Sequence, residues 1–293
     1  MKKKVLVSMA VLSAVCAMGA GSMVSMADED VTKVTWFASR PVDGPIDKTI
    51  RQLAKDYSDA HDGTWELEVV TEADRPSYLE KLKTLIAGGN MPDIIDIDAT
   101  PYCQELVDAG YLVDMNTWLK DNSIYDSFLP ISLAYQEFTD GDLYTLPMEL
   151  NAEMIWYNKE IFEKCGITKT PSSLNEWLDD CEIIKNAGYT PISVDGIDRW
   201  PVLRYLAMAP YAETGNDYAI KLANGEVSMG DETGLKGLDF YTKIGQYFQD
   251  GFATTDYAAA QSMFINGESA MYYIGTWEFA AMNDLYNEGK IDY

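Results

Sequence analysis

The sequence predicts an α/β fold arranged in two lobes. Strand-like and helix-like segments alternate along most of the chain, which is the pattern that builds parallel sheets flanked by helices. The 293 residues suffice for two lobes, and a composition of 47% hydrophobic and 24% charged residues is typical of a folded, water-soluble chain.

The first alternating region lies near the N-terminal end. Residues 31–37 are rich in β-forming side chains, residues 46–57 place apolar side chains on one helical face, and residues 65–69 alternate apolar with polar side chains. A second amphipathic helix ends at Gly88-Gly89, before a short apolar strand at 93–98. This βαβαβ order predicts a parallel sheet, and such sheets bind ligands beyond the carboxyl ends of their strands. The predicted ends are residues 37–40, 72–75 and 98–102.

A second alternating region begins near Leu146-Pro147. A capping box at Ser173-Leu174-Asn175-Glu176 predicts a helix that runs to Gly188, and Asp231 is the expected N-cap of another helix. The chain stops at residues 290–293, which read as the opening of a strand. The expected strands are 152–157, 190–194 and 270–274, and the other expected helices are a short one ended by Cys165-Gly166, 200–211, 232–250 and 257–265.

Acidic residues dominate the charge. Lys and Arg number 22 against 47 Asp and Glu, and without residues 1–27, which hold three lysines and no acid, the difference is 19 − 47 = −28. A surface with this much negative charge repels phosphate backbones and anionic lipids. We therefore expect neither a nucleic-acid partner nor membrane-surface binding. The single histidine, His61, lies in a polar turn, which nearly excludes His-based metal sites and Ser-His-Asp or Cys-His catalysis. We expect no metal and no cofactor.

Residues 1–27 have the features of a secretory signal. Three lysines precede an uncharged run, and Ser25-Met26-Ala27 places small residues at the positions that a signal peptidase reads. An uncleaved anchor is a lesser alternative, because Ser, Gly and Ala dilute the apolar run. A lipid anchor at Cys16 is another, although the residues before it fit a lipobox poorly. We therefore expect a secreted protein, at the extracellular face of the membrane or in the periplasm.

Three cysteines remain beyond residue 27: Cys103, Cys165 and Cys181. An odd number leaves at least one thiol unpaired, so the sequence implies no disulfide framework. We interpret Cys165 and Cys181 as small buried hydrophobic residues.

Aromatic residues make up 12% of the chain, and several fall in loops or at strand ends. These are Trp36, Tyr102, Trp200 and Trp277. Aromatic faces bury flat, partly apolar ligands while neighbouring polar groups bind hydroxyls, and a pyranose ring needs both. Core packing is the competing interpretation for any one of them, so the prediction depends on their joint placement at predicted carboxyl ends.

Seven short motifs occur in order along the chain. They are Gly89-Asn90-Met91-Pro92-Asp93-Ile94-Ile95, Leu146-Pro147, Trp156-Tyr157-Asn158-Lys159, Phe162-Glu163-Lys164-Cys165-Gly166-Ile167, Pro171-Ser172-Ser173-Leu174-Asn175-Glu176-Trp177, Gly188-Tyr189-Thr190-Pro191-Ile192, and Phe264-Ile265-Asn266-Gly267-Glu268-Ser269-Ala270-Met271 through Gly275-Thr276-Trp277. In this order, behind a secretory signal, the series resembles the extracellular solute-binding proteins of carbohydrate ABC importers, the family that includes maltose-binding protein. The resemblance covers nearly all of residues 31–277.

The resemblance implies a two-lobe, periplasmic-binding-protein-like fold, in which each lobe is a mostly parallel sheet flanked by helices. The N-terminal lobe would comprise residues 28–147 and the second lobe residues 148–293, with the first crossing near residues 144–150. In this family the chain then returns to the first lobe, so we expect that this chain lacks the second crossing and the end of lobe one.

The same resemblance implies the substrate-binding component of an ABC transporter. Such a protein binds a mono- or oligosaccharide between its lobes, closes over it by hinge bending, and delivers it unaltered to permease subunits driven by an ATPase. We expect a monomer without catalytic residues. Two alternatives stay open: a secreted glycoside hydrolase, since the 47 acids leave room for a catalytic pair, and a sugar receptor that feeds a sensor kinase or chemotaxis protein.

Carried over onto this chain, the Gly-Thr-Trp motif makes Trp277 a sugar-stacking platform at a helix start. Gly275 would permit close approach of the backbone, with Thr276 between the two. The other expected ligand contacts, assigned by position, are Ser39, Arg40, Asp98, Thr100, Tyr102, Asn151, Asp198, Arg199 and Trp200.

Several of these residues also admit a purely structural role. Arg40 could pair with Asp43, and surface ion pairs of this kind are weak. Asp96 and Asp98 share a strand face and could bind a cation, but no calcium-loop spacing follows them. Asn151 could hydrogen-bond the hinge backbone.

Overall fold

A computed structural model of the chain describes residues 31–40, 42–138 and 141–292. It divides into two compact units, one ending at Asp96 and one beginning at Ile97, which are described separately below. The predicted signal at 1–27, with Cys16, lies outside the described residues. The lobe boundary at residue 147 and the crossing at 144–150 stay predictions.

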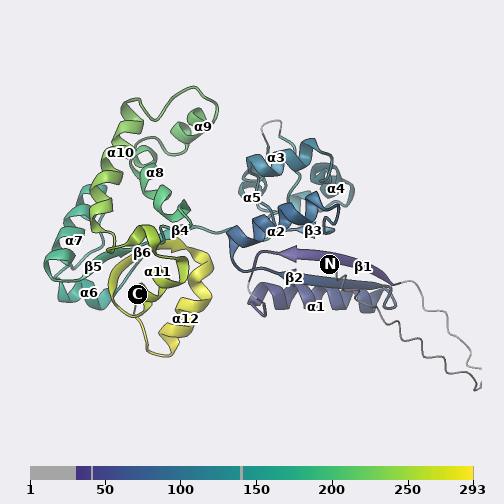
Figure 1. Cartoon of the computed structure of the whole chain (residues 1–293), viewed down its shortest axis with the longest axis horizontal. Coiled ribbons are helices and arrows are strands. Elements are labelled where there is room, and N and C mark those ends of the chain that lie inside the picture. The colour runs from purple at the N-terminus through teal and green to yellow at the C-terminus, as the bar shows by residue number, and fades with distance from the viewer. Residues whose placement is uncertain (1–30, 41, 139–140, 293) are drawn as a thin grey trace, which may run out of the picture. The chain divides into compact units, whose positions relative to one another are not determined.

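The first unit contains a three-stranded parallel sheet in the order β2-β1-β3. The strands are β1 (Thr32–Ala38), β2 (Trp65–Thr71) and β3 (Ile94–Ile95), and the helices are α1 (Pro45–Ala60) and α2 (Arg75–Ala87). The two helices lie on opposite sides of the sheet (Figure 1). The predicted βαβαβ order is therefore confirmed, and it brings the carboxyl ends of the strands to one edge.

Side-chain hydrogen bonds shorten the third strand of this sheet. The prediction gave residues 93–98, whereas β3 spans only two residues. The Asp93 carboxylate accepts hydrogen bonds from the backbone N–H and the hydroxyl of Thr35, at 2.8 and 2.7 Å. Asp96 uses its own carboxylate across the strand ends, as described below. Side-chain bonds thus join both acids to residues of β1, and the backbone adds one longer bond, from the Asp96 N–H to the Phe37 carbonyl at 3.4 Å.

Helix α1 does not bury the whole of its predicted apolar face. Leu53 and Tyr57 are exposed, and the Tyr57 ring stacks on His61 with the centroids 4.1 Å apart. His61 is the exposed C-cap residue of α1, as its polar turn predicted. The core of this unit instead uses Trp36, Phe37, Ala38, Tyr78 and Leu82.

The second unit opens with short helices that the sequence did not predict. They are α3 (Pro101–Asp108), α4 (Met115–Asp121), the 3-10 helix η1 (Tyr125–Ser127) and α5 (Pro130–Ala134). Leu119, Leu133 and Leu143 form a small buried cluster among them. Each helix has at most eight residues, too few for an apolar period to stand out in the sequence.

The main sheet of the second unit has the strand order β4-β6-β5. Its strands are β4 (Glu153–Tyr157), β5 (Thr190–Ser193) and β6 (Ser269–Gly275). Strand β5 runs parallel to β6, whereas β4 runs antiparallel, so this sheet is mixed where a mostly parallel sheet was expected. Because β4 is antiparallel, its start at Glu153 lies opposite the end of β6 at Gly275.

Helices cover both faces of this sheet (Figure 1). Met271 and Tyr273 of β6 pack on one side, while Tyr272 and Ile274 pack on the other, as the two-residue period of a strand requires. The helices are α6 (Lys159–Lys164), α7 (Leu174–Asn186), α8 (Trp200–Thr214), α9 (Asp217–Ala223), α10 (Glu232–Ile244), α11 (Tyr257–Ile265) and α12 (Phe279–Asn287), with the 3-10 helices η2 (Gly245–Tyr247), η3 (Phe252–Thr254) and η4 (Thr276–Glu278).

The predicted capping box at the start of α7 is confirmed. The Ser173 hydroxyl accepts from the Glu176 N–H at 3.2 Å, and the Glu176 carboxylate accepts from the Ser172 N–H at 2.7 Å. The acid thus returns to the residue before the N-cap rather than to the N-cap itself. The bonds to this carboxylate from the Ser172 N–H and hydroxyl, with one from Lys169, lower the pKa of Glu176 to about 2.

Two predicted elements end differently from expectation. The helix expected over 232–250 stops at Ile244, because the Gln249 N–H donates to the Ile192 carbonyl and Phe248 forms a bridge beside β5. Residues 290–292 are in no strand, and the carbonyl of Asp292 accepts from the Lys159 N–H.

The three described cysteines are all free thiols. Cys181 is fully buried and Cys165 is half-buried, which agrees with their interpretation as small hydrophobic residues. Burial also raises the pKa of the Cys103 thiol to about 11.

Candidate functional site

The end of β6 places an exposed indole at the edge of the second sheet. After Gly275 the chain enters η4, and Trp277 there is 40% exposed, which is unusual for a large aromatic side chain that leaves a buried strand. Its six-membered ring lies against Gly275, where a Cβ atom would come within 2.0 Å of Trp277 Cζ3. The Gly-x-Trp spacing therefore lets the indole fold back over its own backbone.

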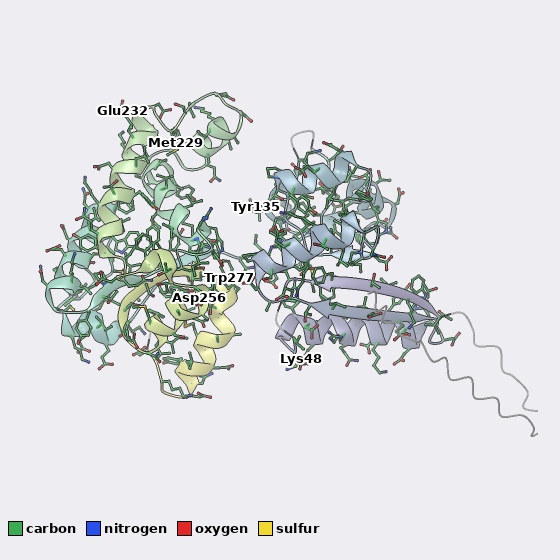
Figure 2. The ribbon with its side chains drawn as sticks, viewed as in Figure 1. Lys48, Tyr135, Met229, Glu232, Asp256 and Trp277 are labelled. Atoms are coloured by element: carbon green, nitrogen blue, oxygen red, sulfur yellow. The ribbon has the colours of Figure 1, made fainter. Side chains whose placement is uncertain are left out.

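A second exposed indole stands at the start of α8. The centroids of Trp200 and Trp277 are 6.1 Å apart and their planes meet at 62°, while Trp200 and Tyr257 are 6.4 Å apart. Trp200 is 36% exposed. We call the two indoles, Trp200 and Trp277, the indole corner; the Tyr257 ring lies beside it. Figure 2 labels Trp277 beside Asp256, which is the N-cap of the helix that begins at Tyr257.

One cation supports the corner. The guanidinium carbon of Arg204 lies 4.0 Å from the centroid of Trp200 and 5.6 Å from that of Trp277. The Arg204 side chain is only 10% exposed, forms an ion pair with Glu153, and donates to the Tyr273 carbonyl at 3.3 Å. Burial lowers the pKa of Arg204 and raises that of Glu153. Because the pair neutralises itself, the cation holds the rings without leaving a free charge at the corner.

A buried acid organises the loop that leads to Trp200. Asp195 follows β5, is 1% exposed, and accepts from the Asp198 N–H at 3.1 Å. The Trp200 N–H donates to the Asp198 carbonyl at 2.8 Å, and Arg199 takes a left-handed φ of 67° between them. The predicted contacts Asp198, Arg199 and Trp200 thus occupy one tight turn, with the side chain of Arg199 exposed.

Asn151 and Thr276 meet where β4 starts and β6 ends. The Thr276 hydroxyl donates to Asn151 Oδ1 at 2.9 Å and accepts from the Ala152 N–H at 3.2 Å. Asn151 Nδ2 also donates to Glu149 at 3.0 Å. Both predicted residues therefore lie beside Trp277, and each already has protein partners.

In the first unit, Asp96 gathers the residues at the strand ends. Its carboxylate accepts from Trp36 Nε1 and the Ser39 N–H, each at 2.9 Å, and from Arg40 Nη2 at 3.0 Å. The Arg40 guanidinium also lies over Trp36, 5.5 Å from the ring centroid. Arg40 therefore pairs with Asp96, and its pairing with Asp43 stays a prediction.

The remaining predicted contacts lie around the start of α3. The Thr100 hydroxyl caps this helix by accepting from the Cys103 N–H at 3.4 Å. The Asp98 carbonyl accepts from the Thr100 N–H at 2.8 Å. Asp98 is exposed and Tyr102 is half-buried. The ligand roles of these residues stay predictions.

Two carboxylates next to the corner are engaged: Glu153 by Arg204, and Glu278 by Tyr257 and Gln261. No group of three His, Cys, Asp or Glu side chains that could hold a metal occurs among the described residues. Nor does any described helix combine the length and the apolar character that crossing a membrane requires.

Sequence reasoning missed the residues that support the rings. Arg204 lies four positions after Trp200 on α8, so helical spacing alone could have placed it under that indole. Tyr257 carried a weaker signal, the N-cap Asp256 before it. Asp195 and Glu278 carried none, because only the fold shows that these acids are buried.

Comparison with known proteins gives a consistent set of relatives. The profile of the bacterial extracellular solute-binding proteins matches residues 43–292. An uncharacterized ABC transporter extracellular-binding protein of Pyrococcus horikoshii is 29% identical over 67% of this chain and 44% of its own length. The multiple sugar-binding protein of Streptococcus mutans is 24% identical over 89% of this chain and 61% of its own.

Solved structures agree with the sequence relatives. A chitin oligosaccharide binding protein superimposes with a TM-score of 0.75 and 25% identity, over 87% of this chain and 64% of that one. The chain thus spans between 44% and 64% of the length of these three proteins.

Proposed function

The chain belongs to the family of bacterial extracellular solute-binding proteins, and on this premise we propose that it is the substrate-binding part of an ABC importer for a carbohydrate. The observation that carries the proposal is the indole corner: two exposed indoles set at 62° at the carboxyl ends of parallel strands. Ligands of open α/β sheets bind at such ends.

The chemistry of the corner favours an uncharged ligand with both apolar and hydroxyl surfaces. The C–H faces of a pyranose pack on indole faces, and its hydroxyls hydrogen-bond to amides, carboxylates and guanidinium groups. Asn151, Asp198 and Arg199 lie near the rings and are polar. The charge of Arg204 is balanced by Glu153, so nothing there requires an anionic sugar.

Names of the relatives support the same proposal. The Streptococcus mutans protein is described as sugar-binding, and the solved structure as binding a chitin oligosaccharide. We infer that the sugar is released unaltered to permease subunits that work with an ATPase, and that the protein acts as a secreted monomer. Glu153 and Glu278 are already engaged by protein partners, which disfavours these two acids as the catalytic pair of a glycoside hydrolase.

The test is the substitution Trp277→Ala. Titration calorimetry against maltotriose, raffinose, chitotriose and xylotriose first finds the sugars that the unchanged protein binds. Loss of the indole is expected to weaken binding at least several-fold, since an aromatic contact contributes about 1 kcal/mol. Trp118→Ala is the matched control, because Trp118 is 44% exposed on α4, outside the corner.

Unchanged affinity in Trp277→Ala would remove the indole from the binding site. Release of reducing ends during incubation with the same sugars would contradict the proposal itself, because a transport receptor leaves its ligand intact.

A further inference from the structure

A buried carboxylate lies directly behind the exposed indole of Trp277. Glu278 follows it in the chain but is only 4% exposed. It therefore cannot meet a ligand on the open face of the indole. A buried acid is costly unless hydrogen-bonded, so its partners indicate what it does.

The partners of Glu278 form a directed chain that ends on the indole. One carboxylate oxygen accepts from Gln261 Nε2 at 2.5 Å, and the other accepts from the Tyr257 hydroxyl. Because the hydroxyl gives its single proton to Glu278, its oxygen is free to accept, and Trp277 Nε1 donates to it at 2.8 Å. The acceptor-only carboxylate thus fixes the direction of both bonds. Burial and the bond to Glu278 both raise the pKa of Tyr257, so the hydroxyl keeps its proton at any physiological pH.

The other end of the indole is held by packing. Its six-membered ring rests on Gly275, and the three atoms nearest to a Cβ built there all belong to that ring. The indole is thus fixed at its nitrogen by hydrogen bonding and at its far edge by contact with the backbone.

We propose that Glu278 and Tyr257 are positioning residues that lock the Trp277 indole in its ligand-ready orientation before any ligand arrives. The inference rests on the proposed function only in taking this indole as the ligand platform. A side chain that is already ordered strengthens binding, because its conformational entropy has been lost on folding and is not lost again when the ligand binds. On this proposal the two residues act on affinity through the indole, which they hold from behind.

The unchanged protein offers an internal comparison. Trp200 and Trp277 are similarly exposed, at 36% and 40%, but among the described residues Trp200 Nε1 donates no hydrogen bond. In a tryptophan-15N-labelled sample of the full chain, Trp277→Ala and Trp200→Ala identify the two signals among the seven indoles. The Trp277 N–H is expected to exchange with water about fivefold more slowly than that of Trp200, the factor given by one ordinary hydrogen bond.

Substitutions then test the chain itself. Tyr257→Phe removes the acceptor, so the exchange of the Trp277 N–H should accelerate about fivefold and its chemical shift should change. Glu278→Gln keeps an acceptor oxygen for the Tyr257 hydroxyl, so the Trp277 N–H should stay largely protected from exchange. Glu278→Leu removes the acceptor and should lose that protection. Tyr247→Phe is the matched control, because the Tyr247 hydroxyl donates to Glu182 at 3.0 Å on another helix pair.

A Trp277 signal that is unprotected in the unchanged protein, or insensitive to Tyr257→Phe, would overturn the inference. Equal losses of protection of the Trp277 N–H in Glu278→Gln and Glu278→Leu would also count against it.

These readouts need no sugar, so they are separate from the proposed function. If maltotriose, raffinose, chitotriose and xylotriose all fail to bind while the indole behaves as expected, the proposed function fails and the positioning role stands. If one of them binds, Tyr257→Phe should weaken it about fivefold and Tyr247→Phe should not.

Discussion

Substituting Gly275 by alanine should displace the Trp277 indole while leaving the strand intact. Gly275 has φ −84° and ψ 172°, an extended conformation that alanine adopts without strain. The obstacle is the indole, because the new Cβ would lie 2.0 Å from Cζ3 and 2.3 Å from Cε3 of Trp277. Carbon atoms rest about 3.5 Å apart, so the ring must move by about 1.5 Å.

Two opposing effects set the expected change in stability. A shift of about 1.5 Å breaks the 2.8 Å hydrogen bond between Trp277 Nε1 and Tyr257, at a cost of about 1 kcal/mol, and part of the packing is lost as well. Alanine also restricts the unfolded chain, which stabilises by about 0.4–1 kcal/mol. The free energy of unfolding should therefore fall by no more than about 1 kcal/mol, whereas sugar affinity should fall at least fivefold.

A double-mutant cycle separates these effects. In the Trp277→Ala background the clash is absent, so Gly275→Ala should be neutral or stabilising by about 0.4–1 kcal/mol in urea unfolding. Gly245→Ala is the control, since the nearest atom to a Cβ there is 3.9 Å away. An equal loss of stability from Gly275→Ala in both backgrounds would refute the reasoning, because the cost would then lie in the backbone.

Two further predictions concern the supporting structure. In the first unit, Tyr78→Phe should cost about 1–3 kcal/mol in urea unfolding, because the buried hydroxyl donates to the Phe37 carbonyl at 3.1 Å and accepts from the Asp96 N–H at 2.9 Å; Tyr241→Phe, whose hydroxyl has no hydrogen bond among the described residues, should cost little. In the second unit, the lowered pKa of Glu176 means that its stabilising effect is complete above pH 4.5 and is lost as the pH falls towards 2. Thermal unfolding of Glu176→Gln should therefore differ from that of the parent at pH 6 and converge with it near pH 2; a constant difference across this range would contradict the assignment.

Regular periodicity explains which parts of the fold could be predicted. Strand β1, helix α11 and the capping box of α7 were all predictable, because alternation, helical spacing and N-cap chemistry are local properties of the sequence. The end of α10 was not, because a backbone bond from Gln249 to Ile192, far away in the chain, turns the residues that follow Ile244. The helices α3 to α5 were not predicted, because they are too short for an apolar period to stand out in the sequence.

In the candidate site, too, local features could be predicted from the sequence and long-range contacts could not. Trp200 and Trp277 could be proposed from their position after predicted elements and from the motif around Gly275. Helical spacing could also have placed Arg204 near Trp200, but the pairing of Arg204 with Glu153 across 51 positions and of Tyr257 with Glu278 across 21 could not be predicted. Sequence reasoning could therefore place the rings, but not the long-range pairings that orient them.

The net charge of the chain and the local electrostatics of the indole corner act over different distances. A formal net charge of −25 acts at long range and is screened by salt, whereas the corner is set by contacts of a few ångströms between buried groups. There the Arg204 guanidinium meets Glu153, and the Glu278 carboxylate is covered by neutral donors from Tyr257 and Gln261. An acidic protein can thus present aromatic faces backed by charges that are already paired or hydrogen-bonded, and under the proposed function we expect the geometry of the rings, rather than the sign of the field, to decide selectivity there.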